Sequence, residues 1–177
     1  MSTWAVTGAS GFLGTNAGLF LRDRAPAVGF SRRANALTPF STSIELDLRE
    51  STQLSAQIRA IRPSVILHGA AIAGHETAAN DPKQAHEVNV LATEVLAETA
   101  SDIGARMIYI STDALFSGKH GDYKETDPVE PFSIYGETKL EGEERVRSTL
   151  ANHLIVRTNF FGWSETGTKS ILEFFVN

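Results

Sequence analysis

Tyr135 and Lys139 lie four residues apart in the stretch SIYGETKLEGEE, which is rich in helix-forming residues. On a helix, two residues at this spacing share one face, and a surface pair of this kind needs no chemical purpose. A phenol has a pKa near 10, so bringing it to 7 requires about three units, or roughly 4 kcal/mol. A cation one helical turn away can supply part of that preference for the phenolate. The pair therefore indicates a tyrosine that exchanges a proton with a substrate oxygen.

A second hydroxyl precedes this helix in the chain. Ser111, Thr112 and Asp113 follow an apolar strand and open a segment of about twenty residues, 111–132, that shows no convincing period. Irregular segments of this length in a compact domain are usually functional, although the three residues also suit a simple strand-ending turn. We expect the Thr112 hydroxyl to converge with Tyr135 on one cleft and to hold the same substrate oxygen by a hydrogen bond.

The glycines near the N-terminus indicate an anion site. Gly8, Gly11 and Gly14 follow the first apolar run in the stretch TGASGFLG, where a strand is expected to pass into a helix. Glycines in such a turn let backbone N–H groups approach a pyrophosphate at the positive end of the helix. The chain has no Walker A sequence and no G-x-S-x-G elbow, so phosphoryl transfer and serine hydrolysis are less well supported. The turn predicts a dinucleotide site.

A basic turn follows the second expected strand. Sites that bind the ribose 2′-hydroxyl usually have Asp or Glu here, whereas this chain has Ser31, Arg32 and Arg33. Arginine suits a 2′-phosphate, so the turn favours NADP(H), with NAD(H) as the alternative cofactor. A basic turn that is merely exposed to solvent would explain the same residues without any cofactor.

Short apolar runs alternate with longer helical patterns along the whole chain. We expect strands at 3–7, 26–30, 43–47, 64–68, 106–111 and 153–157. Helices are expected at 12–24, 51–61, 82–103 and 133–150, with a last one from about 168. This alternation predicts the α/β class, a doubly wound parallel sheet (Rossmann fold) with helices on both faces.

Composition excludes several classes of protein. The 177 residues carry a formal charge of −5, which argues against a nucleic-acid-binding surface. No apolar run is long enough for a membrane span, and with no cysteine a cytoplasmic setting fits best. The five histidines show no paired ligand spacing, so no metal site is expected. His68, at a strand end, either borders the cofactor or is a core histidine.

Several motifs together resemble the extended branch of the short-chain dehydrogenase/reductase family, and within it the dTDP-4-dehydrorhamnose reductase group. They are TGASGFLG at 7–14, HGAA at 68–71, VNV at 88–90, ISTDALF at 110–116 and GDYKETDPVEPFSIYGETKLEGEE at 121–144. VRTNFFGW at 156–163 is similar to the segment that follows the active site, where the family more often has Tyr at the position of Phe161.

The resemblance assigns roles to individual positions. The catalytic positions are Thr112, Tyr135 and Lys139, and Asn89 matches a position that supports the lysine through water. With the basic turn included, the expected cofactor-binding residues are Gly8, Ser10, Gly11, Phe12, Leu13, Gly14, Ser31, Arg32, Arg33, Asp47, Leu48, Ala70, Ala71, Asn89, Tyr135 and Lys139.

By the same resemblance, the expected activity is that of an NADPH-dependent oxidoreductase that reduces the 4-keto group of a nucleotide-linked deoxysugar. Two alternatives stay open: a sugar-nucleotide epimerase or dehydratase that retains its nicotinamide, and a non-catalytic NADP-binding regulatory subunit. The helix expected at 82–103 often pairs with its copy in relatives, which makes a homodimer an expectation.

The expected domain division places the NAD(P)-binding domain, with its catalytic Tyr and Lys, at residues 1–162. Residues 163–177 would begin a C-terminal substrate-binding lobe that is mostly absent. From this division we expect the chain to bind NADPH, to turn over sugar nucleotides poorly and to self-associate through its terminal apolar residues.

Overall fold

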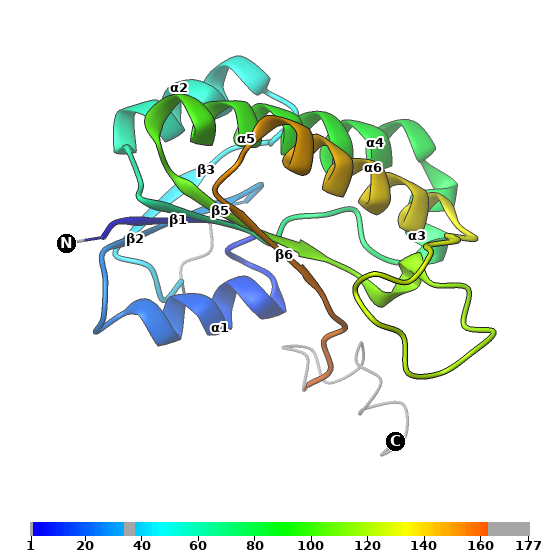
Figure 1. Ribbon diagram of the computed structural model, residues 1–177. Helices are drawn as coiled ribbons and strands as arrows, with labels where there is room; N and C mark the ends of the chain where they lie inside the picture. Colours follow the sequence, from blue (N-terminus) through cyan, green and yellow to red (C-terminus); the bar gives the residue numbers. More distant parts are fainter. Residues whose placement is uncertain (1, 34–37, 163–177) are drawn as a thin grey trace.

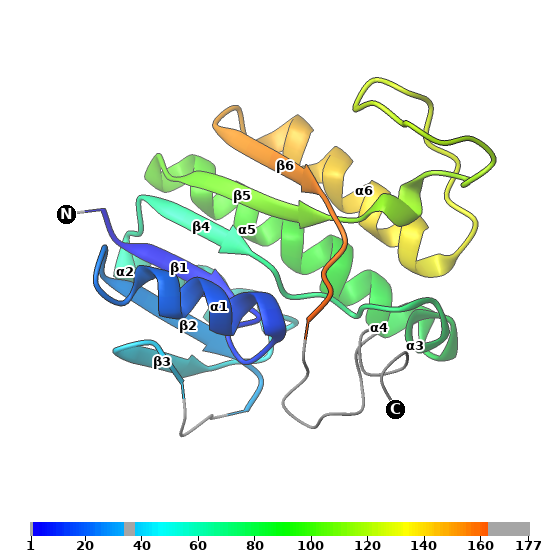
Figure 2. The same cartoon turned by 90° about the horizontal axis from the view of Figure 1, so that it is seen from below.

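Six parallel strands form a single sheet in the order β3-β2-β1-β4-β5-β6 (Figures 1 and 2). The structure, a computed structural model, describes residues 2–33 and 38–162. The strands are β1 Trp4–Thr7, β2 Ala27–Ser31, β3 Thr42–Glu45, β4 Val65–His68, β5 Arg106–Ser111 and β6 His153–Arg157. The strand order changes direction between β1 and β4, and sheets of this kind bind ligands outside the carboxyl ends of the strands at that point.

Helices cover both faces of the sheet. The helices are α1 Phe12–Leu21, α2 Ser51–Ile61, α3 His75–Asn80, α4 Pro82–His86, α5 Ala92–Ile103 and α6 Ile134–Thr149. Figure 1 shows α2, α5 and α6 side by side on one face and α1 on the other. Helix α6 begins at Ser133, whose hydroxyl accepts a hydrogen bond from the Gly136 N–H at 3.2 Å. A serine in this position satisfies one of the free N–H groups of the first turn and so sets where the helix starts.

The helix expected at 82–103 is continuous but not uniform. Asp81 caps α4, with Pro82 in its first turn, and a π-helical segment, Glu87–Leu91, joins α4 to α5. Helix α5 then ends at Gly104, which has a φ of +72° that glycine adopts without strain. The π segment contains Asn89 and widens the helix where it passes under the loop after β4. Such segments often occur at functional sites.

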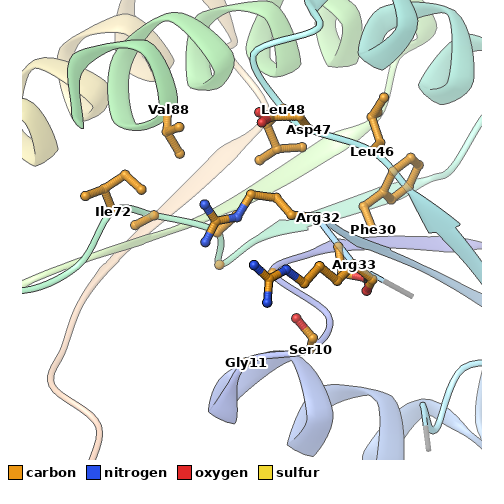
Figure 3. A pocket seen from close by; sticks show the side chains of 15 residues that line it. Ser10, Gly11, Phe30, Arg32, Arg33, Leu46, Asp47, Leu48, Ile72 and Val88 are labelled. Carbon is orange, nitrogen blue, oxygen red and sulfur yellow. Dashed lines mark hydrogen bonds between the residues drawn. The ribbon is translucent and has the colours of Figure 1, made fainter. Parts of the chain in front are cut away.

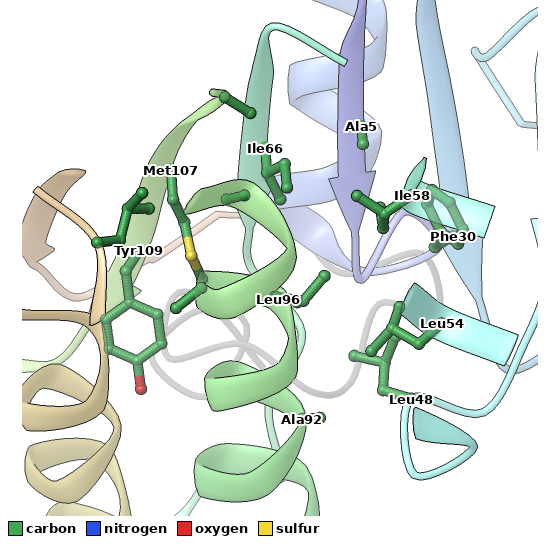
Figure 4. Packing of buried hydrophobic residues seen from close by; sticks show 14 of the residues in the cluster. Ala5, Phe30, Leu48, Leu54, Ile58, Ile66, Ala92, Leu96, Met107 and Tyr109 are labelled. Carbon is green, nitrogen blue, oxygen red and sulfur yellow. The ribbon is translucent and has the colours of Figure 1, made fainter. Parts of the chain in front are cut away.

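The larger hydrophobic core lies between the sheet and the α2, α5 and α6 layer. Ile66 and Met107 from the sheet and Leu96 from α5 are fully buried there (Figure 4). Burying a side chain of this size contributes about 1.5–3 kcal/mol. A smaller cluster that includes Val6 and Leu21 occupies the α1 face. The two cores make the sheet a rigid support for the strand ends.

The predicted doubly wound fold is confirmed, and every strand and helix expected within the described residues is present, with bounds shifted by three residues or fewer. The short helix α3 and the 3₁₀ turn Asp113–Leu115 were not predicted. The helix expected from about residue 168 and the lobe expected at 163–177 lie outside the described residues. No helix among the described residues is long and apolar enough to cross a membrane.

Candidate functional site

In the turn between β1 and α1 and in the first turn of α1, the backbone segments pack so closely that only glycine fits at Gly8 and Gly14. Gly8 has a φ of +71°, and a Cβ there would lie 2.9 Å from the Ala70 backbone nitrogen. A Cβ on Gly14 would lie only 2.2 Å from the Gly8 carbonyl oxygen. The backbone of the turn therefore packs directly against α1 and against the loop after β4. The result is an open concavity at the N-terminus of α1, the arrangement that suits a phosphate group.

A first pocket of about 620 Å³ begins at this turn. Ten of the predicted cofactor residues line it: Gly8, Ser10, Gly11, Ser31, Arg32, Arg33, Asp47, Leu48, Ala70 and Ala71. Figure 3 shows the Arg32 and Arg33 side chains reaching over the pocket from the end of β2, with Ser10 and Gly11 beneath them. Phe30, Leu46, Ile72 and Val88 add apolar walls that were not predicted.

Asp47 is the acidic residue of the first pocket. Its carboxylate accepts hydrogen bonds from the Arg49 guanidinium, the closest at 2.6 Å, and these bonds lower the pKa of Asp47. The carboxylate is thus already matched by Arg49. Among the described residues, no carboxylate lies within ion-pair distance of Arg32 or Arg33, and the charge of Arg32 acts on Asp47 from farther away. Both arginines line the pocket, where an anionic ligand can pair with them.

A second pocket of about 380 Å³ adjoins the first, because Gly69 and Ala71 line both. Thr112, Tyr135 and Lys139, the three predicted catalytic residues, all line this second pocket. Thr112 comes from the end of β5, and Tyr135 and Lys139 come from the first two turns of α6. The expected convergence of the hydroxyl and the phenol is therefore present.

Tyr135 is half-buried. Burial raises its pKa above the ordinary value of 10.0, the Thr112 hydroxyl opposes this by a hydrogen bond, and the charge of Asp113 adds to the rise. Thr112 is itself oriented by the Ala114 N–H, which donates to its Oγ1 at 3.1 Å. The lowering by Lys139 that the spacing predicted is not seen in this structure: the groups that shift the pKa of Tyr135 are its burial, Thr112 and Asp113.

Lys139 is buried against an aromatic ring. Its Nζ lies 3.9 Å from the ring centre of Tyr109 on β5, and 2% of the residue is exposed. Burial lowers the pKa of Lys139 to about 7, while the negative charge of Glu143 opposes the shift. A lysine in this state gains or loses its proton easily near neutral pH.

Glu143 follows Lys139 by one helical turn and is completely buried. Its carboxylate accepts hydrogen bonds from Arg157 on β6 at 2.9 and 2.8 Å and forms an ion pair with Arg147 at 2.8 Å. The Arg157 guanidinium also lies over the Phe116 ring, 5.3 Å from its centre. This cluster therefore ties α6 to β6 and to the loop that follows Thr112.

Two polar residues beneath the site have structural partners. His68 is buried, with Nδ1 2.6 Å from the Thr7 hydroxyl and Nε2 2.9 Å from the Thr93 hydroxyl, and burial lowers its pKa to about 3. It lines neither pocket and is a core histidine. Asn89 accepts from the Ile72 N–H at 2.8 Å and donates to Ile72 O and to Thr138. It also lines neither pocket, so its predicted place among the cofactor contacts is not supported by the geometry.

Comparison with known proteins agrees with this geometry. The family model described as "RmlD substrate binding domain" matches residues 3–172. The chain belongs to the RmlD substrate binding domain family. The chain is 35% identical to dTDP-4-dehydrorhamnose reductase of Escherichia coli K12 over 136 residues, which cover 71% of this chain and 45% of the relative.

Two further relatives of the chain are informative. Methionine adenosyltransferase 2 subunit beta of Bos taurus is 38% identical over 150 residues, or 84% of this chain and 43% of the relative. The crystal structure of dTDP-4-dehydrorhamnose reductase from Bacillus anthracis in complex with NADP superposes with a TM-score of 0.81 at 28% identity. That superposition covers 92% of this chain and 55% of the other. The chain spans about half the length of the curated relatives it matches.

Three of the residues predicted to contact the cofactor have packing roles instead. Gly14 packs against Gly8 and Ala9, Leu13 packs against Gly69, and Phe12 faces Phe160 with ring centres 6.5 Å apart. None of the three lines either pocket. Conversely, sequence reasoning missed His75 and Phe160, which line the second pocket, and Tyr109, on which Lys139 rests. In the strand expected at 106–111, Tyr109 shares a face with Met107 and Ser111, which was a usable signal, whereas His75 lies in an unpredicted helix.

Proposed function

We propose that the chain binds NADP(H) along the two adjoining pockets and reduces the 4-keto group of a nucleotide-linked deoxysugar. The observation that carries the proposal is the continuity of the two pockets through Gly69 and Ala71. It puts a glycine-built phosphate site at one end of a groove and the half-buried Tyr135 with the buried Lys139 at the other. The relatives named dTDP-4-dehydrorhamnose reductase support the choice of substrate class.

The residues of the first pocket fit a dinucleotide. The space beside Gly8 and at the N-terminus of α1 would receive the pyrophosphate, because no Cβ intrudes and the helix end is positive. Arg32 and Arg33 would pair with a 2′-phosphate, and the edge formed by Asp47 and Leu48 would border the adenine. The relative from Bacillus anthracis, solved with NADP, supports the same cofactor.

The residues of the second pocket would handle the substrate oxygen. The bound nicotinamide supplies the hydride. Tyr135 would give its proton to the oxygen as the carbonyl becomes an alcohol. Thr112 would hold that oxygen by a hydrogen bond and stabilise the charge that develops on it. Lys139, whose pKa lies near 7, would balance the charge of the phenolate that is left.

The test is a turnover assay with purified chain, NADPH and a panel of nucleotide-linked sugars with and without a 4-keto group. We expect more than one equivalent of NADPH to be oxidised per chain with dTDP-4-dehydrorhamnose, and none with sugars that lack the keto group. NADPH oxidation that does not depend on the keto group would contradict the proposal.

A second candidate is supported by the similarity to methionine adenosyltransferase 2 subunit beta. In that case the chain would bind NADP(H) as a non-catalytic subunit. The same assay separates the two functions, since such a subunit would bind the cofactor without turnover. An epimerase or dehydratase would convert the sugar without net oxidation of added NADPH.

A further inference from the structure

His75 is a residue of the second pocket that lies close to Tyr135. It is the first residue of α3, directly after Gly74, whose φ of +91° turns the chain from the loop after β4 into the helix. The imidazole lines the pocket together with Thr112, Tyr135 and Lys139, and the residue is exposed to solvent. The catalytic scheme above makes no use of this side chain.

The ring is held in place by the segment that starts α6. Its Nδ1 lies 2.8 Å from Ser133 Oγ, and its face stacks on Phe132 with ring centres 5.2 Å apart and planes 25° apart. The His75 ring is nearly perpendicular to the Tyr135 ring, and the two ring centres lie 6.1 Å apart. Three contacts with residues 132–135 thus fix an exposed ring beside the phenol.

The hydrogen bond to Ser133 determines whether Nε2, the other ring nitrogen of His75, is a donor or an acceptor. We assign the His75 tautomer in which Ser133 donates its proton to Nδ1, because Ser133 Oγ already accepts from the Gly136 N–H. With Nδ1 accepting that proton, a neutral ring carries its hydrogen on Nε2, and a charged ring carries one there as well. Nε2 has no partner among the described residues. It is therefore a free donor on a fixed ring.

We infer that His75 is a specificity-determining residue that donates a hydrogen bond from Nε2 to an oxygen of the sugar nucleotide held over Tyr135. The inference rests on the proposed function and adds a substrate contact to it. The exposed Phe132 ring, 68% accessible, stacks on the imidazole and helps to fix its orientation. A sugar nucleotide that lacks the recognised oxygen would bind less well, while the dinucleotide in the first pocket would not be affected.

The test uses two substitutions that each keep one ring nitrogen's function. His75→Asn places an amide near the position of Nδ1, so it can keep the Ser133 contact but loses the donor in the pocket. His75→Gln reaches the position of Nε2, so it can keep the pocket donor but loses the Ser133 contact. The binding of dTDP-4-dehydrorhamnose to NADP⁺-saturated chain is measured by NMR titration, which also detects weak complexes, and NADP⁺ affinity is measured alongside.

We expect His75→Asn to weaken sugar-nucleotide binding roughly fivefold to tenfold, as for one lost hydrogen bond, and His75→Gln to stay within about threefold of the wild type. NADP⁺ affinity should be unchanged in both. If the Asn variant binds like the wild type, or if Gln is the more damaging change, His75 only positions α6 and the inference is wrong. If the wild-type chain binds NADP⁺ but no sugar nucleotide, the proposed function fails and the inference falls with it.

Discussion

The two pockets of the groove differ in the groups that shape them. The first pocket is shaped by backbone at Gly8 and Gly14 and carries exposed charge on Arg32 and Arg33. The second is shaped by side chains, with Lys139 and Glu143 buried beneath Tyr135. Backbone shape and surface charge suit the binding of the part of a ligand that does not react. Buried, charge-sensitive groups suit a step in which a proton moves. Substitutions should therefore separate binding from chemistry.

The sharpest separation is expected for Tyr135→Phe. Loss of the proton donor should lower turnover by roughly 10²–10⁴-fold, while NADPH affinity stays within about threefold of the wild type. Steady-state kinetics and a direct NADPH titration measure the two quantities. A comparable loss of cofactor affinity would show that the two pockets do not separate cofactor binding from chemistry.

Gly14→Ala should damage the first pocket through the backbone. Its Cβ would lie 2.2 Å from the Gly8 carbonyl oxygen, so the turn must move, at a cost of about 1–3 kcal/mol in the free energy of unfolding. Gly11→Ala is the matched control, because its Cβ would lie 3.3 Å from the same oxygen. Chemical denaturation of both variants tests the packing effect. NADPH titration is read for Gly14→Ala alone, because Gly11 itself lines the first pocket. Equal effects of the two substitutions would show that close packing is not what Gly14 provides.

The double substitution Arg32→Ala and Arg33→Ala should change cofactor choice without changing chemistry. We expect the wild type to prefer NADPH over NADH by about tenfold to a hundredfold, from charge-assisted hydrogen bonds to the 2′-phosphate. The variant should bind both cofactors about equally. Arg22→Ala, at the C-terminal end of α1 and outside both pockets, serves as a charge control. A preference that survives the double substitution would remove these arginines from cofactor recognition.

His68, beneath both pockets, should make the fold sensitive to acid. Its pKa is about 3 in the fold and near 6.5 when unfolded, so the unfolded chain binds more protons between these values. Stability therefore falls as the pH drops below 6.5, by about 2 kcal/mol at pH 5 from this group. Denaturation at pH 7 and pH 5 should show a smaller loss for His68→Asn than for the wild type. The same pH dependence in both would assign the acid sensitivity to other groups.

Features with a local cause could be predicted from the sequence. The strands 106–111 and 153–157 were predicted to the residue, because apolar runs bounded by turns indicate strands directly. The dinucleotide turn was predictable from glycine spacing, and the pairing of Tyr135 with Lys139 followed from helical geometry. These signals need no knowledge of distant contacts.

Features with a tertiary cause could not be predicted. The rise in the pKa of Tyr135 comes from burial, and the position of Lys139 comes from Tyr109, which lies on a strand thirty residues earlier in the chain. The role of Gly14 as a packing residue depends on the path of Gly8 and Ala9. Helix α3 has only six residues, too few to show a helical period, so His75 was not placed.

The most direct measurement asks whether the two pockets act as one site. The absorbance of the ionised Tyr135 phenol is titrated with and without saturating NADP⁺, and the Tyr135→Phe variant is subtracted to remove Tyr109 and Tyr123. Without NADP⁺ we expect a pKa above 10, because the phenol is buried. With NADP⁺ bound, the nicotinamide and a charged Lys139 should lower that pKa toward 7. A pKa that NADP⁺ leaves unchanged would contradict a single groove that joins cofactor and acid.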